Sequence, residues 1–194
     1  QETLLVRLRR RLGCDTLTPL HRLDRETAGL VLLARHPESR AAYEALFAQR
    51  QVTKTYQAIA RWDPQLQFPL RRVSTLVDAD HFMQMREAGA DDTPQLPNAH
   101  TTIELLEIQG SWARYALQPQ TGKRHQLRVH MAALGIPILG DRIYPQLLPE
   151  GTDDPGNPLR LLAERLQFTD PFTGQARDFV SQMRLDFPDP LSFS

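Results

Sequence analysis

The stretch that decides the fold is HRLDRETAGLVLLAR, residues 21–35. Its charged start, residues 21–24 (HRLD), is followed by a turn at residues 27–29 (TAG) and by the apolar run 30–34 (LVLLA). A short apolar run bounded by turn residues is typical of a buried strand. A side chain beside such a strand is held by a rigid scaffold. The pattern makes Asp24 a candidate functional carboxylate, although its spacing equally fits a solvated turn residue paired with Arg22 or Arg25.

A second stretch, residues 121–130 (TGKRHQLRVH), leads into residues 135–141 (GIPILGD). Together with residues 21–35, it resembles the two signature segments of the RluA-type pseudouridine synthases, which read HRLD-x-x-TSG-L and TGR-x-HQ-(I/L)-R-VH, then G-x-PI-x-GD. The chain differs at Ala28, where the pattern has serine, and at Lys123, where it has arginine. The resemblance implies an α+β catalytic domain with a bent, mixed but mostly antiparallel sheet and packed helices. It also implies an isomerase that converts a uridine of structured ribosomal or transfer RNA to pseudouridine without a cofactor.

The resemblance also assigns roles to single residues. Asp24 becomes the catalytic carboxylate, and Arg128 its expected partner at about 4 Å or less. Residues 54–56 (KTY) match a family K-x-Y segment whose tyrosine, here Tyr56, lies beside the target base. Arg22 resembles the family arginine that fills the place of the displaced base. The residues expected to bind the RNA are His21, Arg22, Lys54, Lys123, Arg124, His125 and Gln126.

Composition places the chain among ordinary globular proteins. Its 194 residues are 41% hydrophobic and 24% charged, and the size favours one domain, residues 1–194. The sequence contains neither an apolar run of about 18 residues nor a signal-peptide pattern, so we expect a cytoplasmic monomer without a membrane partner. The single cysteine excludes an internal disulfide. His125 and His130 are five residues apart, a spacing that does not put both side chains on one face of a helix. We therefore predict no metal site and disfavour a metal-dependent hydrolase.

Charge is distributed unevenly along a chain whose formal net charge is zero. Residues 1–56 hold ten Lys and Arg against six Asp and Glu, whereas residues 146–194 hold four against eight. Because phosphate contacts need clustered basic side chains, this excess favours RNA as the partner, although an evenly solvated surface remains an alternative. The competing function is a catalytically idle RNA-binding module with the same fold.

Hydrophobic periodicity predicts the secondary structure around these motifs. Helices are expected at residues 2–12, ended by Gly13, at 38–50 and at 124–134, where Arg124 and Arg128 would share a face. Strands are expected at residues 52–60, in a hairpin at 101–108 and 112–117, and in a closing hairpin at 159–168 and 176–180. Residues 63–99 suggest an edge hairpin or loop insertion. The chain begins with Gln1 inside a helix, which suggests that the N-terminal part of the catalytic domain is missing.

Overall fold

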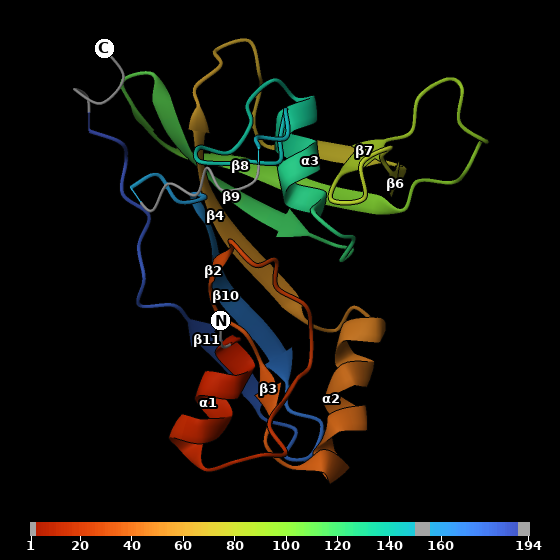
Figure 1. Cartoon of the computed structure of the whole chain (residues 1–194), viewed down its shortest axis with the longest axis vertical. Helices are drawn as coiled ribbons and strands as arrows, with labels where there is room; N and C mark the ends of the chain where they lie inside the picture. Colours follow the sequence, from red (N-terminus) through yellow and green to blue (C-terminus); the bar gives the residue numbers. More distant parts are fainter. Residues whose placement is uncertain (1–2, 150–155, 190–194) are drawn as a thin grey trace.

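The computed structural model describes residues 3–149 and 156–189 and shows one main sheet with helices packed around it (Figure 1). The strands of this sheet are β2 (Ala28–Gly29), β4 (Thr53–Arg61), β5 (Leu70–Ser74), β8 (Ala99–Gln109), β9 (Trp112–Pro119), β10 (Leu161–Thr169) and β11 (Ala176–Val180). Their order is β11-β10-β4-β9-β8-β5, and all these neighbours are antiparallel. β2 pairs with β10 in parallel. The predicted α+β class and mostly antiparallel sheet are therefore confirmed.

The helices are α1 (Leu4–Leu12), α2 (Pro37–Ala48) and α3 (Gln126–Ala133). α1 begins where the Thr3 side chain accepts a hydrogen bond from the Val6 amide, and it ends at Gly13, whose φ of 57° is left-handed. The end at Gly13 was predicted, whereas the cap at Thr3 was not. The apolar periodicity that predicts α1 does not correspond to a buried face, because none of its residues is buried and Leu4 and Leu12 are exposed. The helix lies on the outside of one end of the molecule (Figure 1).

The apolar run 30–34 does not form the single buried strand that was predicted. Instead, β2 pairs with β10, and two other short strands, β1 (Thr18–Pro19) and β3 (Leu33–Ala34), pair with each other in a separate small sheet. The break occurs at Gly29, where φ is 102° and an added Cβ would lie 2.2 Å from the Ala163 carbonyl oxygen. The chain touches β10 there and leaves it after one more hydrogen bond, from the Leu30 amide to that carbonyl.

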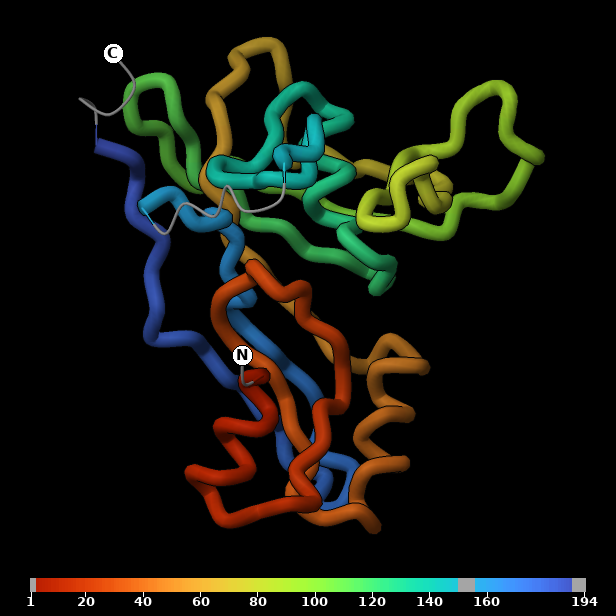
Figure 2. Tube along the Cα trace, viewed as in Figure 1, coloured from red at the N-terminus to blue at the C-terminus, as the bar shows by residue number. Residues whose placement is uncertain are grey.

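The second signature stretch packs α3 onto the sheet. Leu127 and Met131 join the core cluster that also contains Ala58 of β4, Ile103 of β8 and Tyr115 of β9. The β8–β9 hairpin is confirmed. Within residues 63–99, β5 lies at the edge of the main sheet, while β6 (Leu76–Asp78) and β7 (Met85–Glu87) form a separate two-stranded sheet. Figure 2 shows the part of this segment that follows β5 extending to one side of the main sheet, beside α3.

Candidate functional site

The loop that carries Asp24 borders a cleft between α3, β4 and β10. Asp24 and Arg22 line it from the loop, and Lys54 and Tyr56 line it from β4. Residues 121–123 and Gln126 line it from the second signature stretch. Residues more than a hundred positions apart therefore meet at one place. Lys54 and Tyr56 share this face, as the strand alternation predicts.

Asp24 is held by the backbone rather than by a close cation. The Thr27 amide donates to the Asp24 carbonyl at 3.0 Å, which closes a turn directly after the aspartate. The nearest Arg22 nitrogen lies 3.9 Å from the Asp24 carboxylate, beyond hydrogen-bond distance, and the Asp24 side chain is 18% exposed. Because the Arg22 side chain is 62% exposed, water screens this pair, which contributes at most about 1 kcal/mol. The carboxylate is thus accessible from the cleft, with Arg22 at the rim.

Tyr56 is the cleft residue whose ionisation is most affected. Burial, and then the negative charge of Asp24, raise the pKa of the Tyr56 hydroxyl to about 12. The hydroxyl is consequently neutral at physiological pH and can both donate and accept a hydrogen bond. Burial also lowers the pKa of the Lys54 ammonium on the same strand. β4 pairs with strands on both sides, so these two side chains are carried by a rigid central strand.

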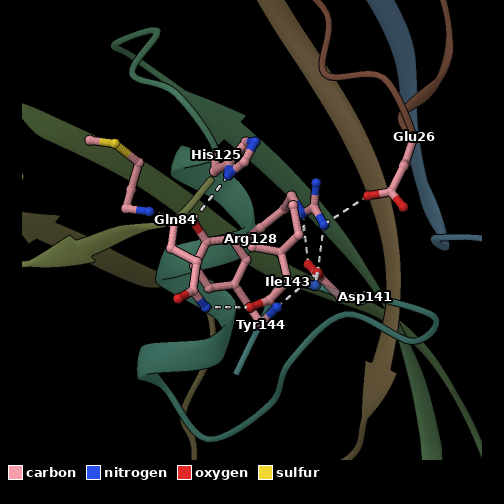
Figure 3. A network of polar contacts seen from close by, with 8 residues as sticks. Glu26, Gln84, His125, Arg128, Asp141, Ile143 and Tyr144 are labelled. Atoms are coloured by element: carbon pink, nitrogen blue, oxygen red, sulfur yellow. Dashed lines mark hydrogen bonds and ion pairs between the residues drawn. The ribbon is translucent and has the colours of Figure 1, made fainter. Parts of the chain in front are cut away.

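Arg128 is buried, but the predicted ion pair with Asp24 is wrong. Its Nε donates to Asp141 Oδ2 at 2.7 Å, and its Nη2 donates to Asp141 Oδ1 at 2.6 Å and to Glu26 Oε2 at 3.0 Å (Figure 3). Burial opposes the charge, yet the pKa of Arg128 is raised by Asp141, then by Glu26 and by the more distant Asp24. The guanidinium therefore does not contact Asp24 directly. It acts on Asp24 through its positive charge and through its hydrogen bond to Glu26, which lies on the same loop as Asp24.

The backbone around Asp141 explains this choice of partner. Gly140 has a φ of 76°, and an added Cβ would lie 2.3 Å from the Pro158 carbonyl oxygen, so only glycine fits before the aspartate. Asp141 Oδ1 also accepts hydrogen bonds from the amides of Ile143 and Tyr144, at 2.9 and 3.0 Å. These donors hold the carboxylate against Arg128. Glu26, two residues after Asp24, then ties the loop that carries Asp24 to α3 through the same guanidinium.

Arg124 does not share a helix face with Arg128, contrary to the prediction. His125 is the residue before the helix and has a left-handed φ of 54°, so α3 begins only at Gln126. Arg124 therefore points elsewhere, and its Nη2 donates to Asp78 at 2.7 Å and to the Gln84 carbonyl at 3.2 Å. Sequence periodicity missed this because a single left-handed residue changes the direction of the side chains before it.

Several residues predicted to bind RNA use their polar atoms within the protein. The side-chain oxygen of Gln126 accepts hydrogen bonds from the Thr121 hydroxyl and from the backbone amide of Lys123. Its side-chain nitrogen donates to the His100 carbonyl and to the Thr101 hydroxyl.

His21 is used in the same way. His21 Nε2 accepts from the Leu32 amide at 3.0 Å, and its ring stacks on Phe47 at 4.8 Å. Burial lowers the pKa of His21, which keeps this acceptor nitrogen unprotonated. The His125 ring likewise contacts the Tyr144 hydroxyl at 3.0 Å. Gln126, His21 and His125 therefore hold the site in shape through contacts within the protein. Arg22, Lys54 and Lys123 present charge to it.

A second groove continues from the cleft and is basic. It is lined by Arg22, Arg50, Lys54 and Lys123, together with uncharged residues of β4, the end of α2 and the turn before α3. Asp24 is the one acid among the residues that line the cleft, and the groove lining contains none. A polyanion can therefore approach Asp24 along this side.

Comparison with known proteins identifies the family. A sequence model of the family described as RNA pseudouridylate synthase matches residues 1–133. The chain belongs to this family. A tRNA pseudouridine synthase C of Vibrio cholerae is 33% identical over 186 residues, which cover 90% of this chain and 75% of that protein. An uncharacterized RNA pseudouridine synthase of Haemophilus influenzae is 38% identical over 127 residues, 64% of this chain and about half (53%) of that protein.

A solved structure agrees with the pseudouridylate synthase assignment. Human RNA pseudouridylate synthase domain containing 1 superposes with a TM-score of 0.76 at 26% identity, covering 97% of this chain and 74% of that one. Within residues 3–149 and 156–189, no group of His, Cys, Asp and Glu side chains is arranged to hold a metal ion. In that same part of the chain, no helix is long and apolar enough to cross a membrane.

Two residues of this pseudouridylate synthase site were not assigned a role from the sequence. Asp141 ends the GIPILGD segment, and Glu26 lies within the first signature stretch, yet only the structure shows that both bind Arg128. The available signal was the GIPILGD segment itself, which the family pattern includes and which ends in Gly140 and Asp141.

Proposed function

We propose that this protein isomerises a uridine of structured RNA to pseudouridine, with Asp24 as the catalytic carboxylate. The observation that carries the proposal is the meeting of Asp24 and Tyr56 in one cleft whose remaining charged lining, Arg22, Lys54 and Lys123, is basic. A neutral tyrosine beside a carboxylate suits a reaction on an uncharged base, and the basic lining suits the phosphates on either side. A module that only binds RNA gains nothing from a carboxylate facing phosphates.

The reaction breaks the bond from ribose C1′ to uracil N1, rotates the base and joins C1′ to C5. The proton lost from C5 balances the proton gained at N1, so the product is an isomer and no cofactor takes part. Asp24 attacks the sugar or the base, stabilises an oxocarbenium-like sugar, or removes a ribose proton. The Tyr56 ring packs on the uracil while its hydroxyl relays a proton, and Arg22 occupies the place that the extruded base leaves.

Transfer RNA is the substrate class that the relatives favour. The Vibrio cholerae relative, which matches 90% of this chain, is described as a tRNA pseudouridine synthase. Ribosomal RNA is the other candidate. Mapping pseudouridine in both RNAs from cells with and without the full-length gene separates them, since only the true substrate loses a modified position.

The test of the chemistry is release of tritium from RNA labelled at uracil C5, because that hydrogen leaves when C5 bonds to the sugar. Asp24→Asn keeps the shape of the side chain and removes its charge, so tritium release should fall to background while RNA binding largely survives. Asp15→Asn, at an exposed aspartate outside the cleft, is the matched control and should keep full activity. Turnover by Asp24→Asn near the parent rate would refute the assignment, and an inactive parent that still binds RNA would favour the idle module.

A further inference from the structure

A large groove, distinct from the cleft and from the basic groove that continues from it, lies on the other side of the catalytic loop. Arg22 and Asp24 line the cleft, whereas the next residues, Arg25 and Glu26, line this groove. Its volume is about 1080 Å³, at the upper limit of pockets that hold small ligands. The loop is thus a wall shared by two concave surfaces. A chain that enters the cleft at Asp24 can continue over the loop into the groove.

The outer wall of the groove presents an aromatic ring to solvent. Phe82 is 76% exposed, and it stacks on His81 with ring centroids 5.0 Å apart and an angle of 29° between the planes. A single exposed apolar side chain is ordinary, but Phe82 differs from the other exposed phenylalanine of high exposure, Phe172, in lining the large groove. One face of the Phe82 ring is covered by His81, so an added flat group would extend an existing stack.

The turn that carries Phe82 is tied to the wall opposite the catalytic loop. The Gln84 side chain donates to the Ile143 carbonyl at 2.8 Å, and the Met85 amide donates to the Tyr144 hydroxyl at 2.7 Å. Arg124 adds a bond to the Gln84 carbonyl. The Tyr144 amide in turn donates to Asp141, the partner of Arg128. The turn that carries Phe82 and the catalytic loop are therefore joined to one network of polar contacts (Figure 3).

The charge of the groove suits a polyanion. Its lining includes Arg25, Arg124 and Arg142, whereas the fourth lining arginine, Arg128, is buried and already paired with Glu26 and Asp141. The Asp78 carboxylate that pairs with Arg124 is 81% exposed, so this bond is screened and contributes little. Stacked aromatic rings beside arginines are the combination that binds single-stranded nucleic acid.

We propose that this groove binds the nucleotides next to the target uridine, with one unpaired base stacked on Phe82 and the adjoining phosphates contacting Arg25 and Arg124. The proposal rests on the function proposed above and adds a second contact surface to it. A protein partner would also find apolar side chains here, such as the exposed Leu148, but it would not need an arginine-rich lining. RNA is therefore the occupant that the charges favour.

The test compares three substitutions at Phe82 for binding of unmodified transfer RNA transcripts. Phe82→Ala removes the stacking surface and should weaken binding by about 5- to 150-fold. Phe82→Leu keeps the apolar volume without a flat ring and should weaken binding similarly, whereas Phe82→Trp should retain it. Phe172→Ala is the control, because that phenylalanine is also exposed but lies at the turn between β10 and β11. Its affinity should equal that of the parent.

Two readouts separate this proposal from the function on which it rests. Tritium release by the parent tests the isomerisation, and the affinity series at Phe82 tests the groove. If the parent isomerises uridine and Phe82→Ala binds RNA as tightly as Phe172→Ala, the groove proposal is overturned while the function stands. Equal affinity of Phe82→Leu and the parent would also overturn it, since that result indicates apolar contact without stacking. Thermal unfolding of each variant confirms that the fold is retained.

Discussion

Replacing Arg128 with methionine should destabilise the fold far more than removing a comparable surface arginine. Methionine retains much of the apolar length but removes the cation that faces Asp141. The two side chains are 2% and 0% exposed, so the remaining carboxylate is left without water or a counter-charge. Breaking a buried pair in this way costs about 3–5 kcal/mol. Asp141 keeps two backbone amide donors, which lowers the expected loss to about 3 kcal/mol.

The matched control is Arg165→Met. Arg165 also makes two contacts with one carboxylate, Asp178, at 2.8 and 2.5 Å, but the two side chains are 44% and 43% exposed. Water screens that pair and solvates the remaining acid, so the loss should be at most about 1 kcal/mol. The contrast between the two variants isolates the effect of burial from that of ion-pair geometry.

The assay is urea unfolding at 25 °C and pH 7, with the free energy of unfolding extrapolated to water for each variant. The double variant Arg128→Met, Asp141→Asn should lose less than the sum of the two single losses, because the second change removes the isolated charge. Equal losses for Arg128→Met and Arg165→Met would refute the reasoning, as would additive single losses. Catalysis should fall too, since Glu26 loses the partner that anchors the Asp24 loop.

Two further predictions concern ionisation. Tyr56→Phe keeps the ring and removes the hydroxyl, so kcat should fall about 10²- to 10⁴-fold with little change in KM, whereas an unchanged kcat would exclude a proton relay. Burial lowers the pKa of His130 to about 4, below its usual 6.5, so its contribution to stability is present above pH 6.5 and is lost as the pH falls towards 4. The difference amounts to about 3 kcal/mol, and unfolding curves across this pH range should show it in the parent but not in His130→Gln.

The sequence was sufficient where the information is local. The ends of α1 follow from Thr3 and Gly13, whose side-chain and backbone preferences act within one turn of helix. The strand alternation that puts Lys54 and Tyr56 on one face needs only a period of two. The two signature stretches identify the family, and the comparisons confirm it.

Only the tertiary structure decided which charges meet. The family resemblance singled out Arg128 but named Asp24 as its partner, whereas its partners are Asp141, 13 residues away, and Glu26, 102 residues away. The pairing with Asp141 depends on Gly140, whose φ is left-handed and whose backbone packs closely against the Pro158 carbonyl, a contact that no local sequence pattern indicates. β2 ends at Gly29, just before the apolar run 30–34, for the same reason. Local preferences determine how each segment is built, whereas close packing between distant segments determines which carboxylate each buried cation can reach.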